Sequence, residues 1–298
     1  MNDMAAFIQN TLCKLLRMSG LPWMLRNTFS RNRVTVINYH NPSPEVFRSH
    51  MTFFSKLYTF ICIDSLLEAL ETRSFTAIPS KALLVTIDDA HLGNAELLPI
   101  IRDFNIPVVI YAVAGVVGSK RKFWFDLVRE NEQLISRLKQ MTEHDRLCYL
   151  AEEYDYSYNK EYDEPSAMNK YQLLAFQSLG ATIGSHTVHH VILPSCSESV
   201  GLEECINSKE MLEDMLGTEV IHFALPNGSS DERTERWIAE AGYRTCRTTE
   251  PGWVTKSSNP LRLPNFGIDD DASVSKAVVQ ASGIWSYLKR HLRIYTKN

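Results

Sequence analysis

Short apolar runs alternate with helical patterns along most of this chain, and that alternation restricts the fold more than any other feature. Strands separated by helices pair in parallel and need a layer of helices to cover them. We therefore expect an α/β fold, a distorted (β/α) barrel of about seven strands in a single domain with one long insertion. The candidate strands are residues 34–39, 60–63, 82–87, 107–111, 181–185, 220–225 and 243–246.

One helix and one insertion stand out between these strands. Residues 202–216 are typical of a helix that Gly217 ends. Its buried stripe is expected to consist of Leu202, Ile206, Met211, Leu212 and Met215. Residues 120–164 are polar and rich in Tyr, Glu and Lys, and we expect them to form the insertion, with a helix at 126–138.

Both ends of the chain are expected to be helical and to flank the barrel, which we place at residues 33–270. The segment 1–32 has an amphipathic helical pattern, and the segment 271–298 combines aromatic and basic side chains. Neither has the roughly 20 consecutive apolar residues of a membrane span, and no signal-peptide cleavage site is evident. Each segment is either docked on the barrel or in contact with a membrane surface. The apolar face of the first segment contains Phe7, Ile8, Leu12, Leu15 and Leu16.

The charge of the chain bears on its partners, and its cysteine content bears on the redox state of its compartment. The chain has 31 Lys and Arg against 35 Asp and Glu, so a general nucleic-acid partner is not expected. Its six cysteines are scattered without a CxxC pair, which favours reduced thiols. We expect a cytoplasmic protein, with any peripheral membrane contact on the inner face.

Two carboxylates directly follow the candidate strand at 82–87. Function collects at the carboxyl ends of barrel strands, so Asp88 and Asp89 are candidate site residues. Adjacent carboxylates repel each other unless a cation or a proton relieves them. A helix cap or a turn is the structural alternative.

Three histidines lie within residues 186–190, after the candidate strand at 181–185. His186 and His190 are four residues apart, so one helical turn would present both on one face. Two imidazoles with one carboxylate form a common catalytic zinc set that leaves a position for water, and non-haem iron also accepts this set. Asp89 would be the third ligand and Asp88 a neighbouring base. A surface cluster or a buried structural histidine is the alternative.

Two further features have a functional and a structural interpretation. The turn at 226–228 aims the backbone N–H of Asn227 at an oxyanion, or it is a plain turn. Residues 123–125 (FWF) either stack on sugar rings or pack the insertion onto the barrel. Four tyrosines of the insertion could also stack on sugar rings: Tyr154, Tyr156, Tyr158 and Tyr162.

In their order along residues 34–267, these motifs resemble those of the polysaccharide deacetylases, carbohydrate esterase family 4 with its NodB-like domain. Residues 36–40 (VINYH) resemble the opening Tyr-His strand, and residues 86–89 (TIDD) are similar to the Thr-Phe-Asp-Asp motif. Residues 185–190 (SHTVHH) match Ser-His-Thr-x-x-His. Residues 223–228 (FALPNG) resemble the Phe-Ala-Tyr-Pro-x-Gly motif.

The resemblance implies hydrolysis of an N-acetyl or O-acetyl group on a polysaccharide or a lipid-linked glycan precursor. It implies that Asp88 is the base and that Asp89, His186 and His190 bind a divalent metal, for which zinc is expected. The metal would polarise the acetyl carbonyl and lower the pKa of water. The backbone N–H of Asn227 would help to hold the oxyanion.

The arginine that braces the catalytic aspartate in the resembled family is missing from its usual positions. Ala224 occupies the place in the third motif, and Asn265 follows the late Leu-Pro pair. Arg262 is the nearest substitute, but alternation along a strand points it away from Asn265.

Other departures affect the acid and the loop after the aspartates. Ala90 and His91 replace the usual Gly and Tyr, and Ala is costly if the backbone there needs a positive φ. The late histidine acid is unmatched, which leaves His40, His91 and His222 as substitutes. Two other functions therefore stay open beside the deacetylase. One is a metal-binding homologue of weak activity that serves as a glycan-binding or scaffold protein, and the other is a hydrolase of small amides.

Overall fold

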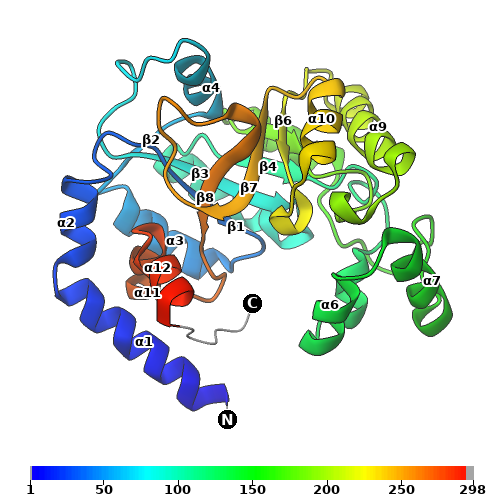
Figure 1. The fold of residues 1–298 in the computed structure, drawn as a ribbon, viewed down its shortest axis with the longest axis horizontal. Helices are drawn as coiled ribbons and strands as arrows, with labels where there is room; N and C mark the ends of the chain where they lie inside the picture. Colours follow the sequence, from blue (N-terminus) through cyan, green and yellow to red (C-terminus); the bar gives the residue numbers. More distant parts are fainter. Residues whose placement is uncertain (1, 293–298) are drawn as a thin grey trace.

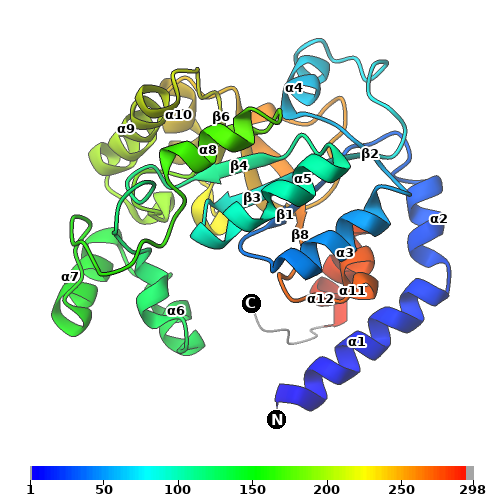
Figure 2. The same cartoon turned by 180° about the vertical axis from the view of Figure 1, so that it is seen from behind.

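The computed structural model describes residues 2–292, in which parallel strands form a closed barrel surrounded by helices (Figure 1, Figure 2). The strands are β1 (Thr35–Tyr39), β2 (Thr59–Phe60), β3 (Ala82–Asp89), β4 (Val109–Ala112), β5 (Thr182–Ser185), β6 (His222–Ala224), β7 (Thr245–Pro251) and β8 (Leu263–Gly267). β1 pairs with both β8 and β3, which closes a ring in the order β1-β8-β7-β6-β5-β4-β3. The predicted seven-stranded (β/α) barrel is confirmed.

The prediction of individual strands needs three corrections. The strand expected at 243–246 is wrong in extent, because β7 runs from Thr245 to Pro251. β8 is absent from the seven candidate strands, because Pro264 and Asn265 interrupt its apolar pattern, although the orientation expected of Arg262 assumed a strand there. The strand expected at 60–63 is wrong in extent, since β2 ends at Phe60 and Ile63 already begins a helix. β2 pairs with β3 but is not one of the seven strands of the ring.

Helices cover the outside of the barrel (Figure 1, Figure 2). The helices are α1 (Asn2–Met18), α2 (Leu21–Asn27), α3 (Pro44–Phe54), α4 (Ile63–Glu71), α5 (Leu98–Phe104), α6 (Glu132–Leu138), α7 (Glu143–Tyr154), α8 (Lys170–Gln177), α9 (Glu198–Leu216), α10 (Glu232–Glu240), α11 (Val274–Ala281) and α12 (Ile284–Leu292). Short 3₁₀ segments are η1 (Leu92–Leu97), η2 (Trp124–Val128), η3 (Leu193–Ser195), η4 (Pro226–Gly228) and η5 (Pro260–Arg262).

Along strand β3, side chains alternate between the helical layer and the barrel interior, and this alternation directs Asp88 to the inside of the barrel. Leu83 and Val85 pack in the core beneath the surrounding helices, whereas Leu84 packs in the cluster inside the barrel. Successive side chains of a strand face opposite sides. Thr86 and Asp88 therefore share the inward side with Leu84, and Asp88 lies at the carboxyl end.

Helix α9 begins earlier than predicted and buries a different stripe. Gly217, with a φ of 69°, ends it as expected. The predicted stripe is wrong at Met211, which is 37% exposed. A Cβ on Gly201 would lie 2.2 Å from Trp237, so the absent side chain lets α9 pack closely on α10. The buried residues of α9 are Gly201, Glu204, Cys205, Ser208, Leu212 and Leu216.

The insertion forms a projection of its own, seen beside α9 and α10 in Figure 1. The helix expected at 126–138 is divided, because η2 ends at Val128 and α6 begins after Asn131, whose side chain caps it. Trp124 of η2 and Leu150 of α7 are buried in a small apolar cluster that joins these two elements.

The N-terminal helices α1 and α2 lie along one edge of the molecule, against α11 and α12 (Figure 1, Figure 2). Cys13 of α1 is buried with Val279 and Trp285. Within residues 2–292, no helix has both the length and the apolar character needed to cross a membrane. Arg293 and Lys297, which belong to the expected basic tail, lie outside the described residues.

Candidate metal centre and active site

Three predicted ligands meet at the carboxyl end of the barrel. Asp89 Oδ1 lies 3.2 Å from His190 Nε2 and 3.6 Å from His186 Nε2. One ligand atom from each residue lies within 4.8 Å of the other two. Asp89 and His186 are buried, and the side chain of His190 is 12% exposed.

The two histidines reach Asp89 from an irregular loop, so the expected helical turn is wrong. His186 follows β5 directly, and the chain from there to His190 contains no helix. Thr187 and His190 have positive φ values of 66° and 57°, which fold this loop back over the barrel. Asp89 and Ala90 have positive φ values of 69° and 58°. Ala90 therefore occupies a conformation that glycine adopts without strain and that costs other residues about 1 kcal/mol.

The chemistry of these donors fits a divalent cation. His186 Nδ1 lies 2.8 Å from the carbonyl oxygen of Ala224, so Nδ1 carries the proton and Nε2 keeps a free lone pair. Burial lowers the pKa of His186 to about 4, and the imidazole is neutral at pH 7. Asp89 Oδ1 is buried and has no hydrogen-bond partner among the described residues. A bound cation would satisfy this oxygen and both imidazoles.

His91 is tied to the carboxylate of Asp89. Its Nε2 lies 3.3 Å from Asp89 Oδ2, and its ring packs against Phe123 with centroids 4.7 Å apart. Burial opposes the charged imidazolium, yet the Asp89 carboxylate raises the pKa of His91 overall. Burial would likewise raise the pKa of Asp89, but His190 and His91 lower that pKa well below its usual range. Asp89 is therefore ionised and suited to bind a cation.

Asp88 lies beside this cluster with one oxygen occupied and one free. Its Oδ2 accepts a hydrogen bond from Asn38 Nδ2 at 3.2 Å and pairs with the buried guanidinium of Arg247. Its buried Oδ1 has no hydrogen-bond partner among the described residues. The free oxygen is available to accept a proton from a group that enters the site.

Arg247 corrects the expectation that a bracing arginine is missing. It comes from β7, one position beyond the strand expected at 243–246. Arg262, the substitute considered from the sequence, is instead exposed and pairs with Glu235 and Glu250. The sequence holds no local signal for Arg247, because its burial beside Asp88 depends on where β7 lies in the closed barrel.

Of the three substitutes for the acid, two lie at the site and one does not. His40 is exposed, and its Nε2 lies 3.9 Å from Asp88 Oδ2. The carboxylate of Asp270 accepts hydrogen bonds from the backbone N–H of His40, at 3.0 Å, and of the following residue. His222 begins β6 and contacts Asp64 of α4, at the amino end of the barrel. His222 is therefore excluded as the acid.

The turn that contains Asn227 lies at the same end of the barrel as the histidines. It follows β6, whose last residue, Ala224, accepts the hydrogen bond of His186. Asn227 has a φ of 59°, and its side chain donates to Ser229 Oγ at 3.2 Å. The side-chain amide is thereby engaged within the turn.

Aromatic residues of the insertion support the histidine loop. Trp124 is 2% exposed, and its Nε1 donates to the carbonyl oxygen of His190 at 3.1 Å. The ring of Phe125 lies against the ring of His190, with centroids 4.8 Å apart. The packing interpretation of residues 123–125 is therefore the correct one for Trp124.

A buried carboxylate on α9, which the sequence did not indicate as functional, holds the same loop. Glu204 Oε2 accepts hydrogen bonds from the backbone N–H of Val188, at 2.9 Å, and of His189, at 3.0 Å. Glu204 Oε1 lies 2.6 Å from His189 Nδ1, and the ring of Tyr158 stacks on His189 at 3.8 Å. The insertion and α9 therefore fix the loop from two sides.

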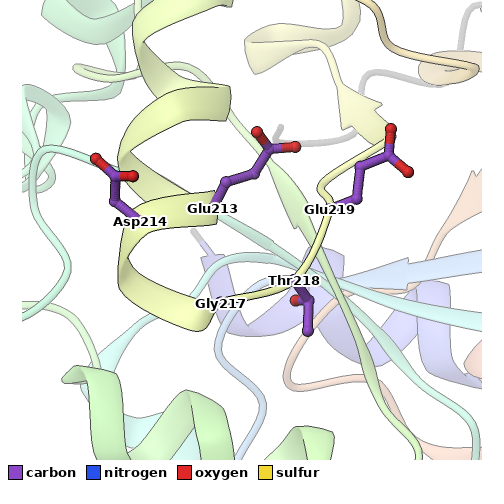
Figure 3. Close-up of a pocket in the computed structure, with 5 residues that line it drawn as sticks. All are labelled: Glu213, Asp214, Gly217, Thr218 and Glu219. Atoms are coloured by element: carbon purple, nitrogen blue, oxygen red, sulfur yellow. The ribbon is translucent and has the colours of Figure 1, made fainter.

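A hollow of about 320 Å³ at the end of α9 is separate from this site. The hollow is lined by Gly217 and the residues after it, which precede β6 in the chain. It therefore lies toward the amino end of that strand. Figure 3 shows Glu213 and Asp214 projecting from α9 in different directions. Glu213 already binds Lys209 Nζ and the backbone N–H of Val220.

Comparisons with known proteins agree with one another. Residues 77–246 match the family model for polysaccharide deacetylase. The polysaccharide deacetylase-like protein YxkH of Bacillus subtilis (strain 168) is 21% identical over 196 residues, 65% of this chain and 54% of that protein. This chain thus spans about half the length of the curated relative it matches.

Solved structures show the same fold at low sequence identity. The Streptococcus pyogenes deacetylase PplD, in complex with acetate, is 17% identical with a TM-score of 0.61, over 84% of this chain and 98% of that one. IcaB from Ammonifex degensii is 16% identical with a TM-score of 0.60, over 84% and 97%. A polysaccharide deacetylase from Bacillus cereus is 18% identical with a TM-score of 0.59, over 84% and 69%.

Proposed function

This chain belongs to the polysaccharide deacetylase family, and from that premise we propose that it is a metal-dependent hydrolase of N-acetyl groups on a glycan. The observation that supports metal dependence is the buried set of Asp89, His186 and His190, with an unpartnered carboxylate oxygen between two imidazoles. The proposed substrate is a polysaccharide or a lipid-linked glycan precursor, with O-acetyl groups as a second acyl class.

We propose that Asp89, His186 and His190 hold a divalent cation, with zinc favoured by two nitrogen ligands and one oxygen ligand. A cation bound there supplies a Lewis acid that polarises an acyl carbonyl and lowers the pKa of water. Asp88 Oδ1 accepts the proton of the attacking water, while Arg247 and Asn38 hold the other oxygen.

Two further groups have proposed roles in the same reaction. The backbone N–H of Asn227 donates to the carbonyl oxygen as negative charge develops on it. His40 donates a proton to the leaving amine, which departs as acetate forms. The positions of the two histidines favour His40 over His91, because His40 is open to solvent beside Asp88 whereas His91 is bound to Asp89.

The alternative of a weakly active binding homologue rested on the missing arginine and the missing acid. Arg247 supplies a guanidinium to Asp88 and removes the first ground, and the role proposed for His40 answers the second. A hydrolase of small amides has no specific support in the structure. The deacetylase is therefore the function that the site supports best.

Release of acetate from oligomers of N-acetylglucosamine, with zinc present, tests the proposal. Asp88→Asn should lower kcat by about 10²–10⁴-fold, because general-base catalysis contributes that much. Asp214→Asn, which changes an exposed carboxylate of α9, should leave kcat unchanged. Equal rates for Asp88→Asn and the unmodified chain would refute the assigned base. Glycan binding without acetate release would favour the binding homologue.

The role of His40 is tested by substitution. His40→Gln should lower kcat for release of acetate and leave the zinc content unchanged, because it removes the proposed proton donor and no metal ligand. An unchanged kcat would refute the role.

A further inference from the structure

Helices α1 and α2 present an apolar surface that no other part of the described chain covers. Fourteen large apolar side chains are exposed in residues 2–292, and eight of them lie between residues 4 and 29. We call these eight the N-terminal apolar face. Its members are Met4, Phe7, Ile8, Leu15, Met18, Trp23, Met24 and Phe29.

The N-terminal apolar face is distinct from the side of α1 that packs on the protein. Ile8, Leu15 and Met18 recur at the spacing of one helical stripe. Cys13 lies on the opposite side of the helix, where it is buried against the cluster of α11 and α12, and the partly buried Leu12 lies beside Ile8 at the edge of the exposed side. A surface helix of a soluble domain normally has one apolar side and one polar side. The second apolar side of α1 is therefore unexplained by packing within this chain.

The chain that forms this region is basic. Residues 4–33 carry five Lys and Arg and no acidic residue. Lys276 of the neighbouring α11 pairs with Asp269, so it adds no net charge to this region. Lys14 on α1, Arg31 after α2 and Arg290 on α12 are exposed. Within residues 4–33, no acidic side chain offsets these cations.

We propose that the N-terminal apolar face is a docking surface for an anionic lipid membrane. Apolar side chains flanked by Lys and Arg insert into the boundary between headgroups and acyl chains, and the cations bind anionic headgroups. The exposed Trp23 and Tyr287 are the amphipathic aromatics that favour this boundary. α1 lies along the outer edge of the molecule in both views, so a flat surface can approach it (Figure 1, Figure 2).

A bilayer is a better occupant than a second copy of the chain. A two-fold dimer would bring the same patch of each copy together. The basic side chains beside the apolar face of one copy would then lie against those of the other copy and repel them. No acidic side chain of residues 4–33 would offset this repulsion. An anionic membrane instead attracts both the apolar and the basic components of this surface.

Flotation of the full chain with lipid vesicles tests the proposal. We expect binding to vesicles of phosphatidylcholine with 30% phosphatidylglycerol at low salt, and at least about tenfold weaker binding to phosphatidylcholine alone. The triple variant Phe7→Ser, Leu15→Ser, Met18→Ser should bind the anionic vesicles at least about tenfold more weakly. Tyr171→Ser, which removes an exposed aromatic of α8, should bind like the unmodified chain.

Trp23 provides a second measurement that does not depend on activity. Among the five tryptophans it alone is exposed, so a blue shift of fluorescence on adding anionic vesicles should arise from Trp23. Trp23→Phe should lose the shift and keep flotation.

Three results would overturn the proposal. The first is no flotation of the folded chain with anionic vesicles at low salt, and the second is equal flotation of the triple variant. The third is a stable dimer in solution that the triple variant dissociates, because it would show that a second copy covers this face.

Discussion

At Asp88, two neighbours determine which oxygen can react. Asn38 and Arg247 engage Oδ2, and Oδ1 has no partner among the described residues. Arg247 is itself buried, so the two charges compensate each other in a site with little water. Asn38 and Arg247 therefore orient the proposed base, and Arg247 also compensates the buried negative charge of Asp88.

We predict a strong energetic coupling between Arg247 and Asp88. Arg247→Leu leaves a buried carboxylate without its cation and should lower the free energy of unfolding by about 3–5 kcal/mol. In the double variant with Asp88→Asn, no charge remains, and much of that loss should be recovered. Urea unfolding at pH 7 of the unmodified chain, the two single variants and the double variant measures this coupling. Strictly additive losses would show that the two side chains do not depend on each other.

The residues of the candidate site differ in how far the sequence predicts them. Asp88, Asp89, His186 and His190 lie in two short motifs, each directly after a strand, so local pattern is sufficient to identify them. Arg247 is 159 positions from Asp88, and their contact depends on where β7 lies in the closed barrel. Pairs of that kind follow from three-dimensional closure and carry no local signature.

At the scale of the element, the loop that carries the histidines depends on its neighbours for its shape. Two of its residues have positive φ, and the backbone N–H groups of Val188 and His189 donate to Glu204 rather than to a helix or a strand. Trp124 holds the far end of the loop through the carbonyl oxygen of His190. The spacing of the histidines predicts that they act together, but the expected helical turn fails because these tertiary contacts decide the backbone.

We predict that Glu204 sets the metal affinity without touching the metal. Glu204→Ala frees the two backbone N–H groups and should weaken zinc binding by about tenfold or more, in the range found for groups that orient ligands. Glu204→Gln keeps an acceptor oxygen and should retain most of the affinity. Isothermal titration with zinc distinguishes the three proteins. Unchanged affinity in Glu204→Ala would contradict the role.

We predict that α9 and α10 tolerate no side chain at Gly201. The Cβ of Gly201→Ala would lie 2.2 Å from the Trp237 ring, so the helices must separate. Overpacking of this kind lowers the free energy of unfolding by about 1–3 kcal/mol, more than the roughly 1 kcal/mol that Ala gains in a helix. Asn207→Ala, at an exposed position of α9, serves as the control and should be neutral or stabilising. Thermal unfolding that places Gly201→Ala above the unmodified chain would refute this packing.

For the whole molecule, closure of the barrel by β1 is what gathers the site. β1 pairs with β3 on one side and β8 on the other, and so it brings Asn38 beside Asp88. The alternation of strands and helices predicts the barrel, because each apolar run needs a covering helix. Strand β8 is missing from the candidate strands because Pro264 and Asn265 break the apolar run, although both belong to the strand.

Burial across the molecule predicts unequal reactivity of the six free cysteines. Burial raises the pKa of Cys13 to about 11 and that of Cys196 to about 12, so neither forms a thiolate near pH 8. Cys205 and Cys246 are buried as well, whereas Cys148 is exposed and Cys62 partly so. Titration with a disulfide reagent at pH 8 should detect Cys148 and Cys62 in the folded chain and all six after denaturation. Rapid reaction of all six in the folded chain would contradict the buried core.

The metal content of the purified protein, measured after exposure to zinc and removal of excess, tests the central claim most directly. We predict close to one zinc per chain, because three donors converge on one point. His186→Ala should lose this zinc, and Asp88→Asn should keep it because Asp88 is assigned to proton transfer. Absence of zinc from the folded protein, or its retention in His186→Ala, would contradict the metal centre proposed for Asp89, His186 and His190.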